Sequence, residues 1–249
     1  DAISTTVFLD HDCNGVYNDG VVSVGYSHSC VLDSNGAVQC WGDNQHGQAS
    51  PPAVDLVHIS VGDYHSCGLD AVGGAHCWGI DPNHSYEDGQ ISDTPTDTFA
   101  QLSAGNHHNC ALDSNSNIQC WGNNDEGQST PPSGTFSQIS AGSYHSCALD
   151  NSGSLHCWGV EDSSFSGHGQ VSETPSGTFT QVSAGISHSC ALDNNGSIQC
   201  WGRDNYNQSS PLSGTFVQVS SGDYHNCAVH RLLFLDKETY VSPFTGKRV

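Results

Sequence analysis

An 18-residue motif recurs along most of this sequence. It reads GYSHSCVLDSNGAVQCWG where it starts at Gly25, and a sixth copy that starts at Gly222 matches only over GDYHNCAVH. The first cysteines of successive copies lie alternately 37 and 43 residues apart, which suggests a pair of units used three times. The other copies start at Gly62, Gly105, Gly142 and Gly185. Self-similarity at such a period predicts an array of repeated supersecondary units.

Each complete copy has the pattern of a β-hairpin. In the first copy, Cys30 and Leu32 share one face of a strand, and Val38 and Cys40 share one face of the next, with the turn signal Ser-Asn-Gly at 34–36 between them. Pairing about this turn places Cys30 opposite Cys40, where facing Cβ atoms lie ~4.5–5.5 Å apart, close to disulfide range. The same ten-residue step predicts four more disulfides, Cys67–Cys77, Cys110–Cys120, Cys147–Cys157 and Cys190–Cys200.

Five pairs use ten of the twelve cysteines and leave Cys13 and Cys227. Cys227 lies in the sixth copy, which lacks the second cysteine, and Cys13 ends a segment at 5–13 (TTVFLDHDC) that has the composition of a strand. We expect this strand to supply the missing edge of the sixth copy and Cys13 to pair with Cys227. The bond can close within one chain or join two chains by strand donation.

Zinc is the alternative explanation for paired cysteines. Zinc ligands converge on one point, however, and these pairs are spread evenly along the chain, so disulfides are favoured. Disulfides indicate an oxidising compartment, which predicts an extracellular or cell-surface protein. Because the sequence does not begin with Met, we also expect that a signal peptide has been removed.

The motif resembles the blade repeat of the regulator of chromosome condensation family. In four copies the motif is followed by Gly-Gln, as in the family pattern, whereas Asn207-Gln208 departs from it. The resemblance covers about residues 21–229. The residues of the fifth copy that fit the pattern are Val182, Ser183, Ala184, Gly185, His188, Ala191, Leu192, Gly196, Ile198, Trp201 and Gly202.

That resemblance implies an all-β fold, a radial β-propeller. Six copies suggest six blades, with seven possible because the family commonly has seven, and with one intra-hairpin disulfide per blade. We expect an N-terminal strand and calcium-like loop at 1–20, propeller repeats at 21–229, and a C-terminal tail or closing strand at 230–249. Some secreted bacterial members of the family bind and inhibit β-lactamases, so the scaffold can act purely as a binder.

The charge of the chain narrows its partners. Five Lys and Arg against 26 Asp and Glu give a net charge of −21, and four of the five basic residues lie in the last nineteen positions. Such a surface repels phosphate backbones, so we expect no nucleic-acid partner. The basic patches of a chromatin binder are missing too, which argues against guanine-nucleotide exchange. No apolar run approaches the roughly 20 residues needed to span a bilayer.

Residues 10–20 (DHDCNGVYNDG) break the repeat and resemble the start of an EF-hand or dockerin calcium loop. Oxygen ligands fall at positions 1, 3 and 5, and a Gly at position 6 allows the sharp turn. Position 12 departs from the pattern, because Val21 stands where a bidentate Glu is expected. The alternative is an Asp/Asn/Gly-rich turn. We expect calcium to be held by the side chains of Asp10, Asp12 and Asn14, the carbonyl of Val16, and Asn18 or Asp19.

Three aromatic positions of the repeat read as structural. The histidine two residues before each first cysteine could form a metal-binding or pH-sensing ring, but we favour a hydrogen bond inside its own blade. The tryptophan of each Cys-Trp-Gly is predicted to pack between blades, and the phenylalanine of each Thr-Phe to lie in the core. These residues are His28, His65, His108, His145, His188 and His225; Trp41, Trp78, Trp121, Trp158 and Trp201; and Phe99, Phe136, Phe179 and Phe216.

The even-numbered copies carry longer loops at 80–89 and 160–169, which contain acidic residues. Loops on one face of a propeller are suited to binding. Sequons at Asn83, Asn195 and Asn207 predict glycosylation if the source organism uses them. No nucleophile elbow or phosphate-cradling glycine loop occurs, so we expect no enzymatic activity.

Two hypotheses for function follow from these features. The first is an extracellular structural or adhesive protein, a fibre subunit joined by donated strands and stabilised by calcium. It rests on the disulfides, the calcium-like loop beside Cys13 and the incomplete sixth copy. The alternative is a secreted propeller that binds a protein or glycan, as an inhibitor or a lectin does, through loops 80–89 and 160–169.

Overall fold

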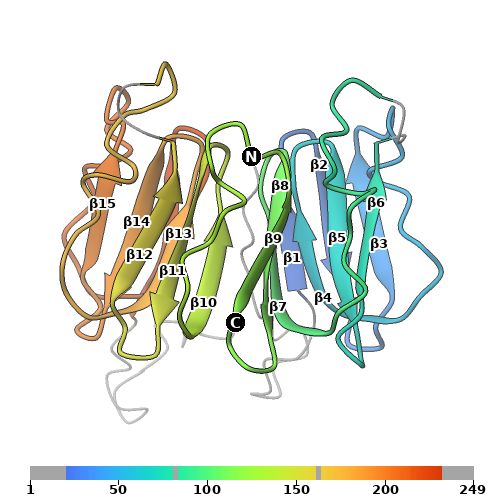
Figure 1. The fold of residues 1–249 in the computed structure, drawn as a ribbon. Helices are drawn as coiled ribbons and strands as arrows, with labels where there is room; N and C mark the ends of the chain where they lie inside the picture. The colour runs from blue at the N-terminus through green and yellow to red at the C-terminus, as the bar shows by residue number, and fades with distance from the viewer. Residues whose placement is uncertain (1–20, 81–83, 161–163, 232–249) are drawn as a thin grey trace, which may run out of the picture.

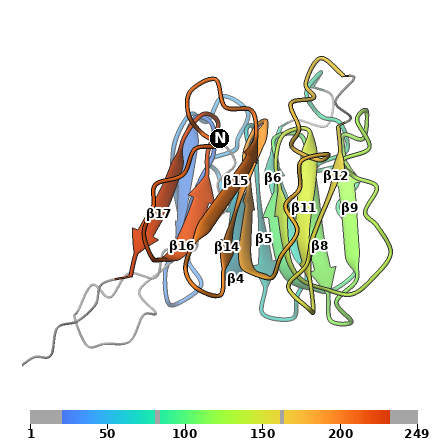
Figure 2. The same cartoon turned by 90° about the vertical axis from the view of Figure 1, so that its left-hand side faces the viewer.

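The computed structural model describes residues 21–80, 84–160 and 164–231, which form a six-bladed β-propeller. Five blades are three-stranded antiparallel sheets, and the described part of the sixth has two strands. The sheets stand side by side around a common axis (Figures 1 and 2), and the first strands of successive blades are in contact with each other. The predicted all-β propeller is therefore confirmed.

Blades one to five comprise β1–β3, β4–β6, β7–β9, β10–β12 and β13–β15, and blade six comprises β16 and β17. The strand bounds are β1 Val21–Val24, β2 His28–Leu32, β3 Val38–Gly42, β4 Leu56–Val61, β5 His65–Asp70, β6 Ala75–Gly79, β7 Phe99–Ala104, β8 His108–Asp113, β9 Ile118–Gly122, β10 Phe136–Ala141, β11 His145–Asp150, β12 Leu155–Gly159, β13 Phe179–Ala184, β14 His188–Asp193, β15 Ile198–Gly202, β16 Phe216–Ser221 and β17 Asn226–His230.

The turn between the second and third strands is held by the aspartate that follows the Leu of each motif. In blade one the Asp33 Oδ1 atom accepts hydrogen bonds from the backbone N–H groups of Asn35 and Ala37, at 2.8 and 3.0 Å. This is the local side-chain-to-backbone pairing that favours Asp in turns. The equivalent residues, with the same pair of bonds, are Asp70, Asp113, Asp150 and Asp193.

The five predicted hairpin disulfides are present, each closing the ten-residue step. In blade one the register pairs Cys30 directly with Cys40, and their Cα atoms are 4.1 Å apart. The first cysteine of each of these five pairs is fully buried. Each disulfide therefore links the second and third strands of a blade and also takes part in packing against the next blade.

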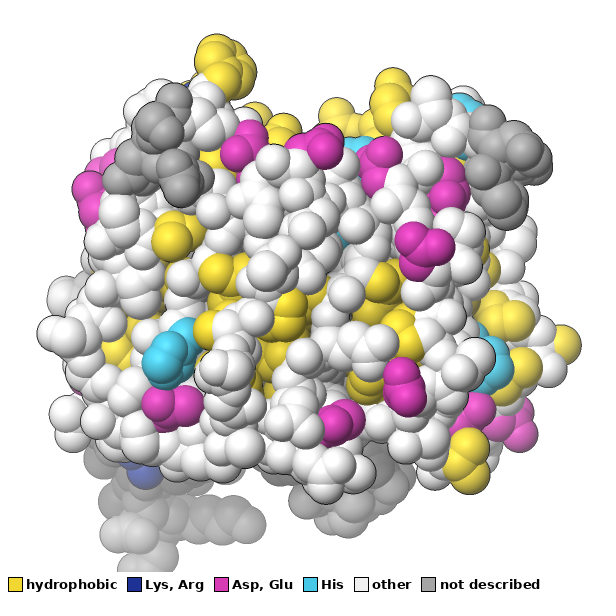
Figure 3. Space-filling model, in the orientation of Figure 1, with side chains coloured by type: hydrophobic (Ala, Val, Ile, Leu, Met, Phe, Trp, Pro, Cys, Tyr) yellow, Lys and Arg dark blue, Asp and Glu magenta, His cyan; other side chains and the backbone are white. Residues whose placement is uncertain are grey.

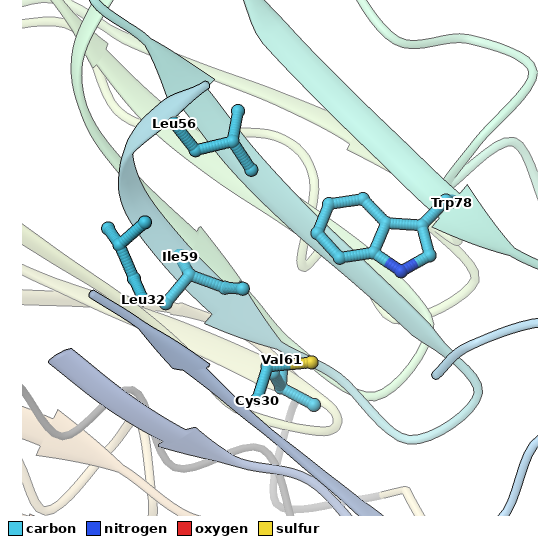
Figure 4. Packing of buried hydrophobic residues seen from close by; sticks show 6 residues of the cluster. All are labelled: Cys30, Leu32, Leu56, Ile59, Val61 and Trp78. Atoms are coloured by element: carbon cyan, nitrogen blue, oxygen red, sulfur yellow. The ribbon is translucent and has the colours of Figure 1, made fainter. Parts of the chain in front are cut away.

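The hydrophobic core is divided into layers between neighbouring blades. Figure 4 shows the first layer, in which Cys30 and Leu32 of blade one meet Leu56, Ile59 and Trp78 of blade two. Three of the four further layers repeat this set at equivalent positions, and the layer between blades five and six lacks the tryptophan. As predicted, the Thr-Phe phenylalanines lie in these layers.

Polar side chains also connect the blades. The Ser60 hydroxyl accepts a hydrogen bond from the backbone N–H of Ala104 in the next blade at 2.9 Å, and the Gln101 side chain accepts one from Ile139 N–H at 3.1 Å. The repeated histidines do the same, since the His65 Nε2 atom lies 2.8 Å from Asn109 Oδ1 of blade three. Our prediction of a bond within the histidine's own blade is therefore wrong, because side chains stand perpendicular to their own sheet and point toward the next one.

Among the described residues, no core layer joins blade six to blade one. Trp41 is consequently 54% exposed, whereas its four equivalents are buried and donate their indole N–H to the carbonyl of a Gln in the loop before their blade. The prediction that Trp41 packs between blades is thus wrong. His225 and Cys227 are exposed for the same reason, while their equivalents in the other blades are buried.

Candidate functional site

One end of the propeller gathers the loops that vary between blades, and we call it the loop face. The first and third strands of a blade run in the same direction, so the turn after the first strand and the segment after the third emerge at the same end. In Figure 1 this end is at the top, where the longer loops after β6 and β12 rise above the rest. Backbone bonds such as Asp43 N–H to Ser27 O, at 2.8 Å, hold the two kinds of segment together.

Five aromatic rings from three blades meet on the loop face, and we call them the five-ring cluster. They come from the segment after β3, the turn before β5, the loop after β6 and the turn before β8. Tyr64 and Tyr86 are stacked, with centroids 5.2 Å apart and an interplanar angle of 12°. The His46 ring packs edge-on against Tyr64 at 5.7 Å and lies 4.6 Å from the His84 ring. His107 completes the cluster, 6.2 Å from Tyr64 and 6.3 Å from Tyr86.

The cluster is partly open to solvent, and nearby carboxylates give it a negative electrostatic potential. Tyr86 is 47% exposed, and the other four rings are half-buried. Burial together with the charges of Asp63 and Asp43 raises the pKa of Tyr64 above its usual value. The Asp88 carboxylate lies 3.7 Å from the His107 Nδ1 atom. Aromatic surface and carboxylates are therefore combined at one place.

Other exposed side chains continue this composition around the loop face. Tyr206 and Tyr224 meet at 5.3 Å between blades five and six, and the Arg203 guanidinium lies 5.9 Å from the Tyr224 ring centre. Phe165, at the tip of the second long loop, is fully exposed. Acidic side chains also line the upper rim in Figure 3. The exposed or half-buried ones of the loop-face segments are Asp43, Glu87, Asp88, Asp125, Glu126 and Asp204, and the buried ones are Asp63 and Asp223.

The repeated histidines do not contribute to this surface. Five of the six are buried between blades, and burial lowers the pKa of His65 to about 4 and those of His108 and His145 to about 3. They are neutral at pH 7, as a structural role requires. Among the described residues, no three His, Cys, Asp or Glu side chains are placed to hold a metal ion.

Several predicted site residues fall outside the described ranges. These include the whole calcium-like loop, Cys13 and the sequon at Asn83, so the calcium site and the Cys13–Cys227 bond stay predictions. Cys227 itself is exposed on β17. The other two sequon residues are exposed, Asn195 in a hairpin turn and Asn207 in the segment after β15, so both positions are accessible for glycosylation.

The acidic loops were predicted from the sequence, but the five-ring cluster was not. The sequence signal for the cluster is that His46, His84 and Tyr86 differ from the residues at the matching positions of blades three and four. Those residues are Glu126, Ser164 and Ser166. A list of departures could have found these residues. Their contact could not be read from the sequence, because it depends on how three consecutive blades are placed around the axis.

Comparisons with known proteins agree with the fold. The profile of the regulator of chromosome condensation (RCC1) repeat matches residues 22–48, 99–128, 136–170 and 179–208. No curated protein sequence matches the chain at a significant level. Among the described residues, no helix is long and apolar enough to cross a membrane.

The solved structures similar to this chain include two plant-type receptor ectodomains. The ectodomain of the Physcomitrella patens receptor kinase CR4 matches with a TM-score of 0.68 and 28% identity, over 84% of this chain and 58% of that one. The CRINKLY WD40 ectodomain of Arabidopsis thaliana ACR4 matches with a TM-score of 0.56 and 24% identity, over 73% and 62%. This chain thus corresponds to about three fifths of the length of those ectodomains. Prp20p of Saccharomyces cerevisiae, with a TM-score of 0.65 and 19% identity over 85% and 70%, shares the fold.

Proposed function

This chain belongs to the regulator of chromosome condensation repeat family, and from that premise we propose that it is a non-catalytic extracellular module that binds a protein partner through its loop face. The disulfide in each of five blades and the similarity to receptor ectodomains support an extracellular location. The observation that carries the binding role is the exposed five-ring cluster on the loop face, because a surface rich in tyrosine is typical of interaction sites.

The charge of the loop face points to a cationic partner. No Lys or Arg precedes Arg203 in the sequence, so the loops of blades one to four carry acidic side chains and no Lys or Arg to balance them. Complementary charge steers association and discriminates against the wrong partners. A positively charged surface on the partner protein therefore fits this end of the propeller, while a nucleic acid does not.

Removing charge from the loop face is expected to weaken partner binding. We would compare the double variant D88N/D125N with D55N/D97N, which removes two exposed carboxylates at the opposite end of the propeller. Exposed charge pairs contribute about 0.2–1 kcal/mol each, so the loop-face variant, which loses two of them, should lose affinity by about two- to thirtyfold, with a slower association rate.

The measurement is surface plasmon resonance against extracellular proteins of the source organism that the wild-type chain captures. The proposal would be contradicted if both variants bound the captured protein as tightly as wild type and if salt did not change that affinity. A loss in D55N/D97N alone would place the interface at the other end.

A second candidate function, supported by blade six, is self-assembly by strand donation. Within the described residues, blade six has two strands where the other blades have three, and Cys227 is exposed on the outer one. An unpaired strand edge can accept a strand from another chain. We propose that segment 5–13 of a neighbouring copy fills this position, that Cys13 bonds to Cys227, and that calcium bound at 10–19 stiffens the junction.

Non-reducing electrophoresis tests this assembly. We expect a ladder that collapses with reductant and is absent from the variants C13S and C227S, and we expect calcium chelation to loosen the oligomers measured by light scattering. A monomer that contains an intramolecular Cys13–Cys227 bond by mass spectrometry would show instead that the strand folds back into its own blade six.

A further inference from the structure

We propose that the five-ring cluster, together with Asp88, is the site that takes a cationic side chain of the partner protein, arginine in preference to lysine. The inference rests on the proposed function and names the chemistry that the loop face recognises.

Aromatic side chains at the positions of His84 and Tyr86 are not needed to hold their loop in shape. The loop at 84–94, in blade two, has a sibling of equal length at 164–174, in blade four, and the two share several internal hydrogen bonds. The Gln90 side chain accepts from Asp88 N–H and donates to the Tyr86 carbonyl, and Gln170 does the same with His168 and Ser166.

The backbone N–H of Tyr86 donates to the His84 Nδ1 atom at 3.2 Å, and that of Ser166 donates to the Ser164 hydroxyl at 3.4 Å, so a serine can take over this bond. The bonds that Glu87 accepts in the first loop have no counterpart in the second, where Gly167 stands.

The hydroxyl of Thr94 donates to the Ile91 carbonyl at 2.8 Å, and that of Thr174 donates to the Val171 carbonyl at 2.7 Å. The sibling loop reaches this conformation with Ser164 and Ser166 at the positions of His84 and Tyr86. The two rings of blade two therefore add a surface to a loop that folds without them.

The geometry of that surface suits a planar cation. Tyr86 is the most exposed ring, and it is stacked on Tyr64, with the His84 ring 5.1 Å from it. A guanidinium held within about 6 Å of a tyrosine ring centre gains cation–π attraction, and its flat shape stacks better than an ammonium. The same chain shows such a contact between Arg203 and Tyr224, at 5.9 Å.

Charge completes the site. The Asp88 side chain is 36% exposed beside His107, and the negative charges of Asp43 and Asp63 are close enough to Tyr64 to help raise its pKa. No Lys or Arg of this chain lies in blades one to four to neutralise them. An incoming arginine would therefore meet both an aromatic face and a carboxylate, whereas a neutral ligand would gain only the first.

The closing experiment replaces the two rings with the residues of the sibling loop. The variant H84S/Y86S keeps the net charge, and its loop has a folded precedent in the same protein. The probe is the peptide acetyl-(Gly-Arg)4-amide, compared with its lysine and citrulline analogues, and binding is measured by isothermal titration calorimetry at low salt. The matched control is Y144A, which removes the tyrosine equivalent to Tyr64 in blade four.

We expect the arginine peptide to bind the wild-type chain and Y144A with the same affinity, and to bind H84S/Y86S about five- to tenfold more weakly. We expect the wild-type chain to bind the lysine peptide less tightly than the arginine peptide, and not to bind the citrulline peptide. Equal affinity of wild type and H84S/Y86S would overturn the inference, because the peptide would then be held by general charge alone. If H84S/Y86S instead loses binding to an oligosaccharide array and keeps the peptide, the cluster is a glycan site and the inference is wrong.

The two proposals fail in different ways. If D88N/D125N weakens capture of the natural partner while H84S/Y86S binds both partner and peptide normally, the loop face binds a protein and the cluster is not its cation site. If neither variant affects the partner, the proposed function itself fails. Thermal unfolding of each variant shows whether the fold is intact, and we expect H84S/Y86S to melt within a few degrees of wild type.

Discussion

Acidification from pH 7 to pH 5 is expected to lower the free energy of unfolding of this propeller by at least about 6 kcal/mol, the contribution of its three most buried repeat histidines. Burial lowers the pKa of His65 to about 4 and those of His108 and His145 to about 3, while the unfolded chain keeps the usual value of about 6.5. The unfolded state therefore binds more protons below pH 6.5, and stability falls as the pH falls.

The size of this effect follows from the pKa values. At pH 5, which is 1.5 units below 6.5, each of these three histidines costs about 2 kcal/mol, since one unit corresponds to about 1.4 kcal/mol. The three together approach the whole stability of an ordinary domain, about 5–15 kcal/mol. The contribution is fully present above pH 6.5 and is lost as the pH falls, down to about 4 for His65 and about 3 for His108 and His145.

Guanidinium unfolding at a series of pH values between 8 and 4 measures this loss. The slope of the free energy against pH should correspond to at least three protons taken up on unfolding. In the variant H145Q the slope should fall by about one proton, whatever the substitution does to the absolute stability. A stability that is constant between pH 7 and pH 5 would contradict the neutral, buried state of these rings.

Hydrogen bonding explains why these histidines are retained at buried positions. The Nε2 atom of His65 faces the Asn109 side-chain oxygen, which can only accept, so that nitrogen carries the proton. His108 and His145 face the hydroxyl groups of Ser146 and Ser189 at 2.8 and 2.7 Å. Each ring thus connects one blade to the next, and a charged ring would have to be accommodated among fully buried neighbours.

The features that depend on local pairing could be predicted from the sequence. The turn and the ten-residue step determine which residues of a hairpin face each other, so the pairing of Cys30 with Cys40 follows without knowledge of the rest of the fold. The burial of Phe136 and Phe179 follows in the same way from their repeated position in an apolar strand.

Features that depend on the next blade could not be predicted in this way. Trp41 and Trp121 have the same neighbours in sequence, but Trp121 is 6% exposed and Trp41 is 54% exposed. The difference arises because a described blade covers Trp121 and none covers Trp41. The five-ring cluster is a second example. Tyr64 and Tyr86 stack because two segments of blade two emerge at the same end, and His46 and His107 reach them from the blades on either side.

Reduction of the hairpin disulfides is expected to unfold the propeller. In the chain-entropy account, closing a loop of about eleven residues contributes about 3 kcal/mol, so five such bonds contribute more than the net stability of most domains. Reduction also disturbs the packing of the core, which lowers the stability further. Cys147 is fully buried against Leu149, Phe179 and Trp201, where two free thiols need more space than the disulfide they replace.

The double variant C147A/C157A isolates one of these bonds. We expect it to lower the free energy of unfolding by about 3 kcal/mol, measured by chemical denaturation under oxidising conditions, whereas the single variant C157A should lose more because it leaves an unpaired thiol in the layer between blades four and five. Full reduction, verified by counting thiols, should abolish the cooperative thermal transition. A reduced chain that melts at the oxidised temperature would mean that the inter-blade layers suffice on their own. The extracellular location inferred from the disulfides would then lose its physical basis, because the fold would be equally stable in a reducing compartment.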